Sequence, residues 1–278
     1  ISTYNLRIGE IMVGIGAMGS AGMSFMFPKH VPKKKPSLIF IEHSVNDNGT
    51  TDRDLVRKGI EGLLRQARSI DTNPDIVLLR AATDPDNDVA ARTTETFELY
   101  KEFAQHYGAA TVDVDAYIQR TLRERGQTWE AVGVDRVHMN DYGNQIWADC
   151  LREWFEEQVR RYETDPSHTG RDADIPQPLF SDELARTRLV SPARKSRRVE
   201  LEGDWQPGDD VCLPWWIDSM LVGRPGARLT YTFAGTSIGT LTMMQPNGLK
   251  VEAKLDGKDA VGPYTNWVAD FYRIELLA

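Results

Sequence analysis

The pattern of hydrophobic and polar positions divides the chain into two parts with different periodicities. In the first part, short apolar runs alternate with longer segments whose apolar residues recur at helical spacing. The runs predict strands over residues 10–16, 37–41, 75–79 and 111–114, and the periodic segments predict helices over residues 52–69, 93–107, 116–125 and 141–159. Such alternation is typical of a parallel sheet that is covered by helices on both faces.

The second part of the chain has the alternating pattern of antiparallel strands. Turns that contain glycine or proline separate the candidate strands, which cover residues 198–202, 228–233, 240–244, 249–256 and 271–276. This texture is typical of an antiparallel β-sandwich. We therefore expect an α/β domain over residues 1–162, a linker without periodicity over 163–189, and a β-sandwich accessory domain over 190–278.

Composition and charge narrow the classes of partner. The formal net charge is −8 and the sequence pI is about 5.2, which argues against a nucleic-acid or anionic-membrane partner. No apolar run reaches the roughly 18 residues that a transmembrane helix needs. The only cysteines, Cys150 and Cys212, lie in different predicted domains, which argues against a disulfide framework or a cysteine zinc site and is compatible with a reducing compartment.

Candidate chemistry follows two of the predicted elements. Asn46 and Asp47 come shortly after the run 37–41, and Asp135 and His138 lie just before the last predicted helix. In a parallel sheet, both places lie along the carboxyl edge of the strands. A histidine with a carboxylate three residues earlier can act as a general base whose tautomer the carboxylate fixes. The same residues could instead only cap the following helix.

A glycine-rich turn over residues 16–22 is the third candidate. It lacks the spacing of a dinucleotide fingerprint and the lysine of a P-loop, so no nucleotide cofactor is expected. The glycine turn, Asn46 and the pair of Asp135 and His138 follow one another along the chain in an order that resembles the SGNH (GDSL-like) hydrolase superfamily. The resemblance covers roughly residues 8–162. The resemblance implies a flavodoxin-like, three-layer α/β/α domain, here followed by a jelly-roll-like β-sandwich.

The resemblance also implies a role for each residue in ester hydrolysis. His138 would be the general base, and Asp135 would orient it. The side-chain amide of Asn46 and a backbone N–H at Gly16 or Ala17 would stabilise the oxyanion of the tetrahedral intermediate. The expected substrate is an acyl ester, in particular an acetyl ester on a carbohydrate, and neither a metal nor a cofactor is implied. The second part contains four tryptophans that could stack on sugars, namely Trp205, Trp215, Trp216 and Trp267. Packing in the core is the stronger interpretation for most of them.

The sequence departs from the family pattern at two positions and lacks one motif. Ser44 stands where the family has a glycine two residues before the asparagine, and Ala17 replaces the turn glycine, which preserves the backbone donor only if its φ is negative. The family nucleophile belongs to a Gly-Asp-Ser motif at the end of a preceding strand, and the chain contains no such motif. Neither Ser20, Ser24 nor Ser44 follows a strand in that position. We therefore expect this sequence to be the remainder of a longer chain, nearly inactive alone and lacking the first strand of its sheet.

Two other functions remain open. One is a non-catalytic carbohydrate-binding protein with a degenerate hydrolase domain, which the sequence of the whole gene would distinguish from the enzyme. The other is a metal-dependent hydrolase that uses four residues: His43, Asp47, Asp135 and His138. This second function is disfavoured because no histidine pair has metal-ligand spacing on one helix.

Overall fold

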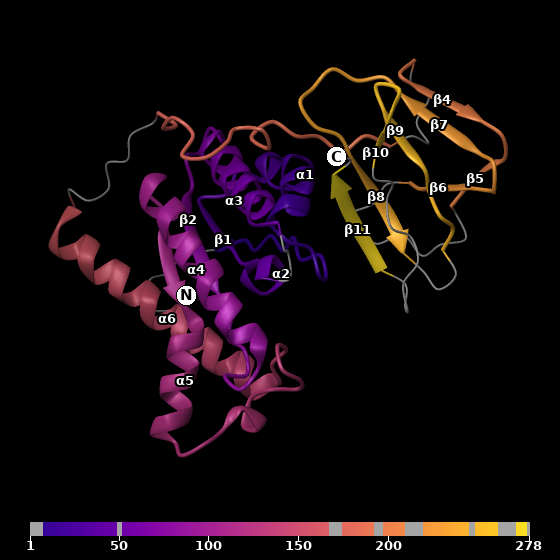
Figure 1. Cartoon of the computed structure of the whole chain (residues 1–278). Coiled ribbons are helices and arrows are strands. Elements are labelled where there is room, and N and C mark those ends of the chain that lie inside the picture. The colour runs from indigo at the N-terminus through magenta and orange to yellow at the C-terminus, as the bar shows by residue number, and fades with distance from the viewer. Residues whose placement is uncertain are drawn as a thin grey trace. The chain divides into compact units, whose positions relative to one another are not determined.

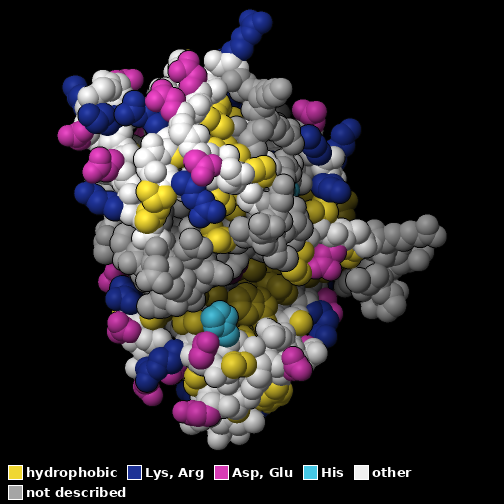
Figure 2. Space-filling model, turned by 90° about the vertical axis from the view of Figure 1, so that its right-hand side faces the viewer, with side chains coloured by type: hydrophobic (Ala, Val, Ile, Leu, Met, Phe, Trp, Pro, Cys, Tyr) yellow, Lys and Arg dark blue, Asp and Glu magenta, His cyan; other side chains and the backbone are white. Residues whose placement is uncertain are grey.

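The computed structural model describes residues 8–48, 52–166, 174–191, 197–208, 219–244, 248–260 and 271–276. The chain forms two compact units, Ile1–Thr187 and Arg188–Ala278 (Figure 1). On the face shown in Figure 2, acidic and basic side chains are interspersed, so charge is not gathered there into one field of a single sign. No helix in the described ranges is both long and apolar enough to cross a membrane.

A parallel three-stranded sheet organises the first unit (Figure 1). Its order is β1 (Leu38–Ile41), β2 (Asp75–Arg80) and β3 (Ala110–Asp113), with β2 in the centre. Four consecutive residues of β2 are fully buried because side chains on both faces of the sheet are covered. These strands confirm the parallel, doubly covered sheet that the apolar runs predict.

The helices of the first unit begin where polar side chains cap them. Asp52, Asn87, Asp113 and Asn140 each accept a backbone N–H of the helix that follows. The cap at Asn87 explains why α4 begins five residues before the predicted start. The helical elements are α1 (Ser20–His30), η1 (Pro32–Lys34), α2 (Ser44–Asn48), α3 (Arg53–Arg68), α4 (Asp88–His106), α5 (Val114–Glu124), η2 (Trp129–Ala131) and α6 (Asp141–Thr164).

The core against one face of the sheet joins β2 and β3 to the last two helices. Val77 and Leu79 pack there with Ile118 of α5 and Ile146 of α6. Since successive strand residues point to opposite faces, Ile76 and Leu78 serve the other face, and all four side chains are buried. Burial of this kind stabilises each large aliphatic side chain by about 1.5–3 kcal/mol relative to exposure.

The prediction of a strand over residues 10–16 is wrong. Residues 8–15 form no ladder with any strand in the described part of the chain, and Met12 is 74% exposed. An apolar run becomes a strand only when a neighbouring strand pairs its backbone N–H and C=O groups. The sequence also fails to predict α1, whose first residues lie within the glycine-rich segment. Gly59 allows α1 to approach α3, because a Cβ there would lie 2.4 Å from the backbone nitrogen of Ala21.

Part of the predicted linker belongs to the first unit. The backbone N–H groups of Leu179, Phe180 and Ser181 donate to the buried carboxylate of Glu61. Further along, the side chain of Leu184 is buried. A segment without periodicity can therefore pack tightly when a side chain satisfies its backbone groups. The first compact unit includes this segment and ends at Thr187.

The second unit is antiparallel, as the alternating pattern predicts. Its strands pair as β4 (Val199–Glu202) with β7 (Arg228–Tyr231), β5 (Trp205–Pro207) with β6 (Leu221–Gly223), β8 (Gly239–Met244) with β11 (Phe271–Leu276), and β9 (Ala253–Leu255) with β10 (Lys258–Ala260). The indole of Trp205 packs over Gly223 and donates to the carbonyls of Glu202 and Arg228, so this ring serves packing. The other three candidate tryptophans lie outside the described residues.

Candidate active site

A closed loop before α6 holds Asp135 and His138. The N–H of Val134 donates to the carbonyl of His138 over 2.8 Å, and the N–H of Asn140 donates to the carbonyl of Val132 over 2.9 Å. The indole of Trp129 donates to the backbone carbonyl of Asp135 over 2.7 Å. These bonds fix the loop backbone, so the loop presents its two titratable side chains in a defined geometry.

Asp135 and His138 form a hydrogen-bonded pair. His138 Nδ1 lies 2.8 Å from Asp135 Oδ2, while Asp135 Oδ1 accepts the backbone N–H groups of Val137 and His138. The bond from Val137, followed by the bond from the His138 side chain, lowers the pKa of Asp135 to about 2. Because Nδ1 is occupied by a carboxylate that is ionised at neutral pH, Nε2 is the nitrogen available for proton transfer. The imidazole is 76% exposed and therefore accessible.

The structure removes the capping explanation for this pair. The side chain of Asn140 caps α6 by accepting the N–H of Gly143 over 2.9 Å, and its amide nitrogen donates to the carbonyl of Ala131. Neither Asp135 nor His138 is needed at the start of the helix. Their side chains are therefore available for chemistry, apart from the local turn that Asp135 stabilises.

Asn46 lies in α2, directly beyond the carboxyl end of β1. Its side chain is half-buried, and no hydrogen bond joins its amide to another described residue. An uncommitted amide donor at this edge of a sheet has the chemistry of an oxyanion ligand, because it stabilises negative charge without titrating.

The glycine turn presents exposed backbone at Gly16 and Ala17. Ala17 has a φ of 54°, so the negative φ expected for a retained donor is absent. The alanine instead adopts the left-handed backbone that glycine adopts readily, and its N–H can therefore keep the direction of a glycine N–H in such a turn. A left-handed conformation costs an L-residue about 1–2 kcal/mol. The turn thus keeps a glycine-type backbone despite its side chain.

Replacing Ala17 with glycine is expected to raise the free energy of unfolding by about 1 kcal/mol, because the strain is removed. Ala91 is the matched control, since it is exposed within α4 and the same substitution there should lower stability by about 1 kcal/mol. Denaturant titration measures both. If A17G lowers the free energy of unfolding as much as A91G does, the backbone of Ala17 is not strained.

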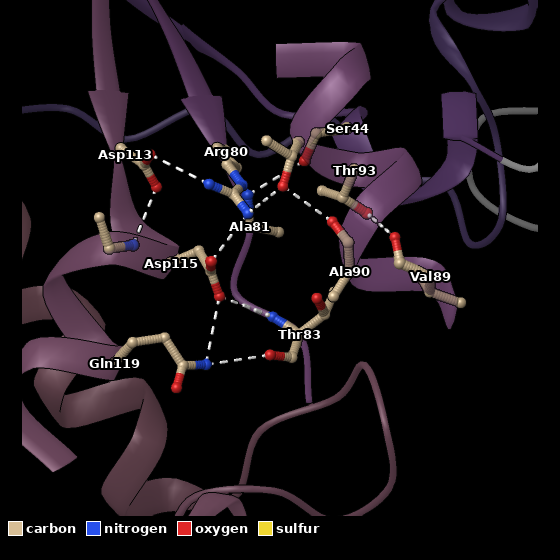
Figure 3. Close-up of polar contacts among 12 residues, drawn as sticks. Ser44, Arg80, Ala81, Thr83, Val89, Ala90, Thr93, Asp113, Asp115 and Gln119 are labelled. Carbon is tan, nitrogen blue, oxygen red and sulfur yellow. Dashed lines mark hydrogen bonds and ion pairs between the residues drawn. The ribbon is translucent and has the colours of Figure 1, made fainter. Parts of the chain in front are cut away.

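Hydrogen bonds connect α2 and the His138 loop to the segment after β2, and Figure 3 shows the bond between Ser44 and Ala81. The N–H of Ala81, just after β2, donates to Ser44 Oγ of α2 over 3.0 Å. Three residues later, the N–H of Asp84 donates to the carbonyl of Arg136 in the His138 loop, also over 3.0 Å. The loop after β2 therefore contacts both α2 and the His138 loop. The hydroxyl of Ser44, the position where the family has glycine, is what makes the first contact possible.

An ionic network supports the loop after β2 (Figure 3). The guanidinium of Arg80 pairs with Asp113 over 3.2 Å and with Asp115 over 2.9 Å. Asp115 in turn accepts the N–H of Thr83, and Gln119 donates to the Thr83 carbonyl. Burial raises the pKa of Asp115, whereas Arg80 opposes that rise. The network holds the strand ends and the loop together, and hydrophobic periodicity gives no sign of it.

No serine of the described residues is hydrogen-bonded to His138. Ser20, Ser24 and Ser44 are buried, and the latter two hydroxyls donate to Ala21 and Glu42. Within the described ranges, no group of three or more histidine, cysteine, aspartate or glutamate side chains could hold a metal ion. The metal hypothesis therefore has no cluster to support it there.

A polar cavity of about 380 Å³ lies beside the His138 loop. Asp84 and Arg136, which connect the two loops, both form part of its wall. The remaining lining residues come from the loop after β2, from α5 and from the segment around η2: Pro85, Asp86, Gln119, Leu122, Arg123, Gln127, Thr128, Trp129 and Glu130. Carboxylates, guanidiniums and amides thus face the same space.

A sequence profile of the GDSL-like lipase/acylhydrolase family matches residues 4–146, just over half of the chain. The chain belongs to this family. It is therefore a carboxylic ester hydrolase by family, with the α/β fold that the sequence pattern predicts. No curated protein sequence matches the chain.

Solved structures are similar to all or part of this chain. A two-domain esterase (CEX) active on acetylated mannans, co-crystallised with mannopentaose, is 17% identical, with a TM-score of 0.63 over 95% of this chain and 68% of that chain. A second structure of that esterase gives 19% identity and a TM-score of 0.59 over 83% of this chain and 56% of that one. An acetyl xylan esterase (AlAXEase) is 22% identical, with a TM-score of 0.45 over 51% and 78%. At these identities, the first two likenesses establish the fold.

Proposed function

We propose that this protein hydrolyses acetyl esters on carbohydrates by a serine, histidine and aspartate mechanism. The observation that carries the proposal is the 2.8 Å pair of His138 and Asp135, held in a closed loop in a member of an acylhydrolase family. His138 is the general base, and Asp135 fixes its tautomer and stabilises the imidazolium that forms.

Each half of the reaction moves one proton through His138 Nε2. The base accepts the proton of the serine hydroxyl as its oxygen attacks the ester carbonyl, and then returns it to the leaving sugar hydroxyl. Water next attacks the acyl-enzyme with the same base, which releases the acid and the free serine. The attacking serine is not Ser20, Ser24 or Ser44, because their hydroxyls are buried.

The oxyanion of each tetrahedral intermediate would be bound by Asn46 and by the turn N–H at Gly16 or Ala17. The uncommitted Asn46 amide and the exposed turn backbone support this assignment. Removal of one such donor typically lowers kcat by about 10²–10³.

Two observations support a carbohydrate as the alcohol. An esterase with the same fold acts on acetylated mannans. In addition, the cavity beside the His138 loop offers both acceptors and donors, such as Asp86 and Arg123, which suit the hydroxyl groups of a sugar better than a hydrocarbon chain.

Acetate release tests the proposal. The protein expressed from its complete gene is expected to release acetate from acetylated mannan or xylan oligosaccharides, and a fluorophosphonate probe is expected to label one serine, which mass spectrometry locates. Binding of these oligosaccharides without acetate release or labelling would instead support the carbohydrate-binding function.

Replacing Arg123 with alanine is expected to lower kcat/KM for an acetylated oligosaccharide by about tenfold, because a hydrogen bond to a charged group contributes about 1.5–3 kcal/mol. Turnover of p-nitrophenyl acetate should stay unchanged, since that substrate has no sugar. Arg120, on α5 outside the cavity lining, is the matched control. Equal losses on both substrates would exclude a sugar contact by Arg123.

A further inference from the structure

The buried carboxylate of Asp47 joins three elements of the first unit. Asp47 is only 2% exposed and directly follows Asn46 in α2. Its Oδ1 accepts the N–H of Ser20, the first residue of α1, over 2.8 Å, and its Oδ2 accepts the hydroxyl of Tyr100 in α4 over 2.5 Å. One side chain therefore links the end of the glycine turn, the helix of Asn46 and the interior of α4.

The contact between the turn and α2 is close. A Cβ at Gly19 would lie 2.5 Å from Asp47 Oδ1, so a side chain at this position would displace the carboxylate. A second bond lies alongside, because His43 Nδ1 is 3.0 Å from the carbonyl of Met18. The end of the turn is thus held at two points, by Asp47 of α2 and by His43 directly before α2.

We propose that Asp47 and Tyr100 are positioning residues that set the separation between the Asn46 amide and the N–H donors of the turn at Gly16 and Ala17. Neither residue contacts the substrate. The proposal rests on the proposed function, because it concerns the oxyanion site of that reaction. Tyr100 acts from α4, 53 residues away from Asp47 in sequence.

The chemistry of the pair suits positioning better than simple packing. A buried carboxylate carries a desolvation penalty that an apolar side chain of similar size would avoid. Burial raises the pKa of Asp47, which His43 opposes, and burial together with Asp47 raises that of Tyr100, so the phenol remains a donor. Two hydrogen bonds in fixed directions orient the turn and the helix relative to each other, which dispersion contacts alone do not.

The sharpest test compares two buried tyrosines of the same unit. Tyr107 also donates to a buried carboxylate, that of Glu61, but this pair is hydrogen-bonded to the segment around Leu179 and to no described residue of the turn or α2. In the full-length protein, Tyr100→Phe should lower kcat for p-nitrophenyl acetate by about tenfold with KM changed less than about twofold. Tyr107→Phe should lower the melting temperature similarly but leave kcat within about twofold.

Amide hydrogen exchange provides a reading that does not depend on turnover. Faster exchange at Met18 to Ser20 is expected in Tyr100→Phe and Asp47→Ala, but not in Tyr107→Phe, while Asp47→Asn should restore much of the protection because its amide oxygen can still accept the Ser20 N–H. Equal effects of the two tyrosine variants on kcat, or unchanged exchange in Asp47→Ala, would overturn the proposal. Absence of turnover in the unmodified protein would refute the proposed function, whereas exchange alone decides whether the pair holds the turn.

Discussion

Replacing His138 with alanine is expected to lower kcat for p-nitrophenyl acetate by about 10³ or more, with a much smaller change in KM. In the proposed mechanism, the imidazole removes the proton of the nucleophile and later protonates the leaving alcohol. Its loss therefore affects the transition states of both halves of the reaction, whereas the ground-state complex loses little. Initial rates over a range of substrate concentrations separate kcat from KM.

His106 is the matched control for this substitution. It is a histidine at the end of α4 whose Nε2 contacts the carbonyl of Gln177, remote in sequence from the loop of the base. His106→Ala should keep kcat within about twofold. If His138→Ala retains turnover, or if both variants lose it equally, His138 is not the base.

The pH dependence of kcat/KM should show no titration of Asp135 in the pH range in which activity is measured. Its pKa is about 2 because the N–H of Val137 and the His138 side chain stabilise the carboxylate. A depressed pKa means that the charge is fully present above the ordinary carboxyl pKa and is lost only as the pH falls through about 2. Any loss of kcat/KM between about pH 5 and 7 therefore reports a group other than Asp135.

Local patterns predict most of the sheet and the contact between Asp135 and His138. The strands β1, β2 and β3 follow from apolar runs, because strands buried on both faces leave a continuous hydrophobic signal. Asp135 and His138 are three residues apart in a polar turn, so their contact depends on few other elements. Because the two residues are so close in the chain, their hydrogen bond can be predicted from the sequence.

Long-range contacts escape such patterns. The segment over residues 10–16 has the composition of a strand, yet pairing depends on a neighbour that its own residues do not specify. Tyr100 occupies one of several apolar positions along α4, and nothing in the periodicity distinguishes it as the donor to Asp47. Likewise, Glu61 reads as a polar residue of α3, although it is buried and binds a backbone segment more than a hundred positions later.

The structure gives physical reasons for two of the departures from the family pattern. Ser44 gains a structural function, since its hydroxyl accepts the Ala81 N–H and donates to Glu42, contacts that glycine cannot make. Ala17 keeps the positive φ that a glycine would adopt. The Ser44 side chain therefore adds contacts to the edge of the sheet, while Ala17 leaves the turn in a conformation that favours glycine.

Replacing Asn46 with alanine is expected to lower kcat by about 10²–10³ while KM stays within about threefold, because an oxyanion donor acts on the transition state and contributes little to ground-state binding. Since no described residue binds the Asn46 amide, removing it should leave the fold intact. Thermal unfolding of the variant should thus follow that of the unmodified protein, and the loss can be assigned to the reaction.

Asn48 distinguishes a catalytic amide from a structural one in the same short helix. Its amide is buried and donates to Thr93 Oγ1 over 3.0 Å, so Asn48→Ala should cost about 1–3 kcal/mol of stability with little change in kcat. Opposite results are therefore expected for the two variants. Asn46→Ala should lower kcat without lowering stability, and Asn48→Ala should lower stability without lowering kcat. A loss of stability in Asn46→Ala that matches its loss of turnover would instead identify Asn46 as a structural residue, leaving the turn backbone as the remaining oxyanion donor.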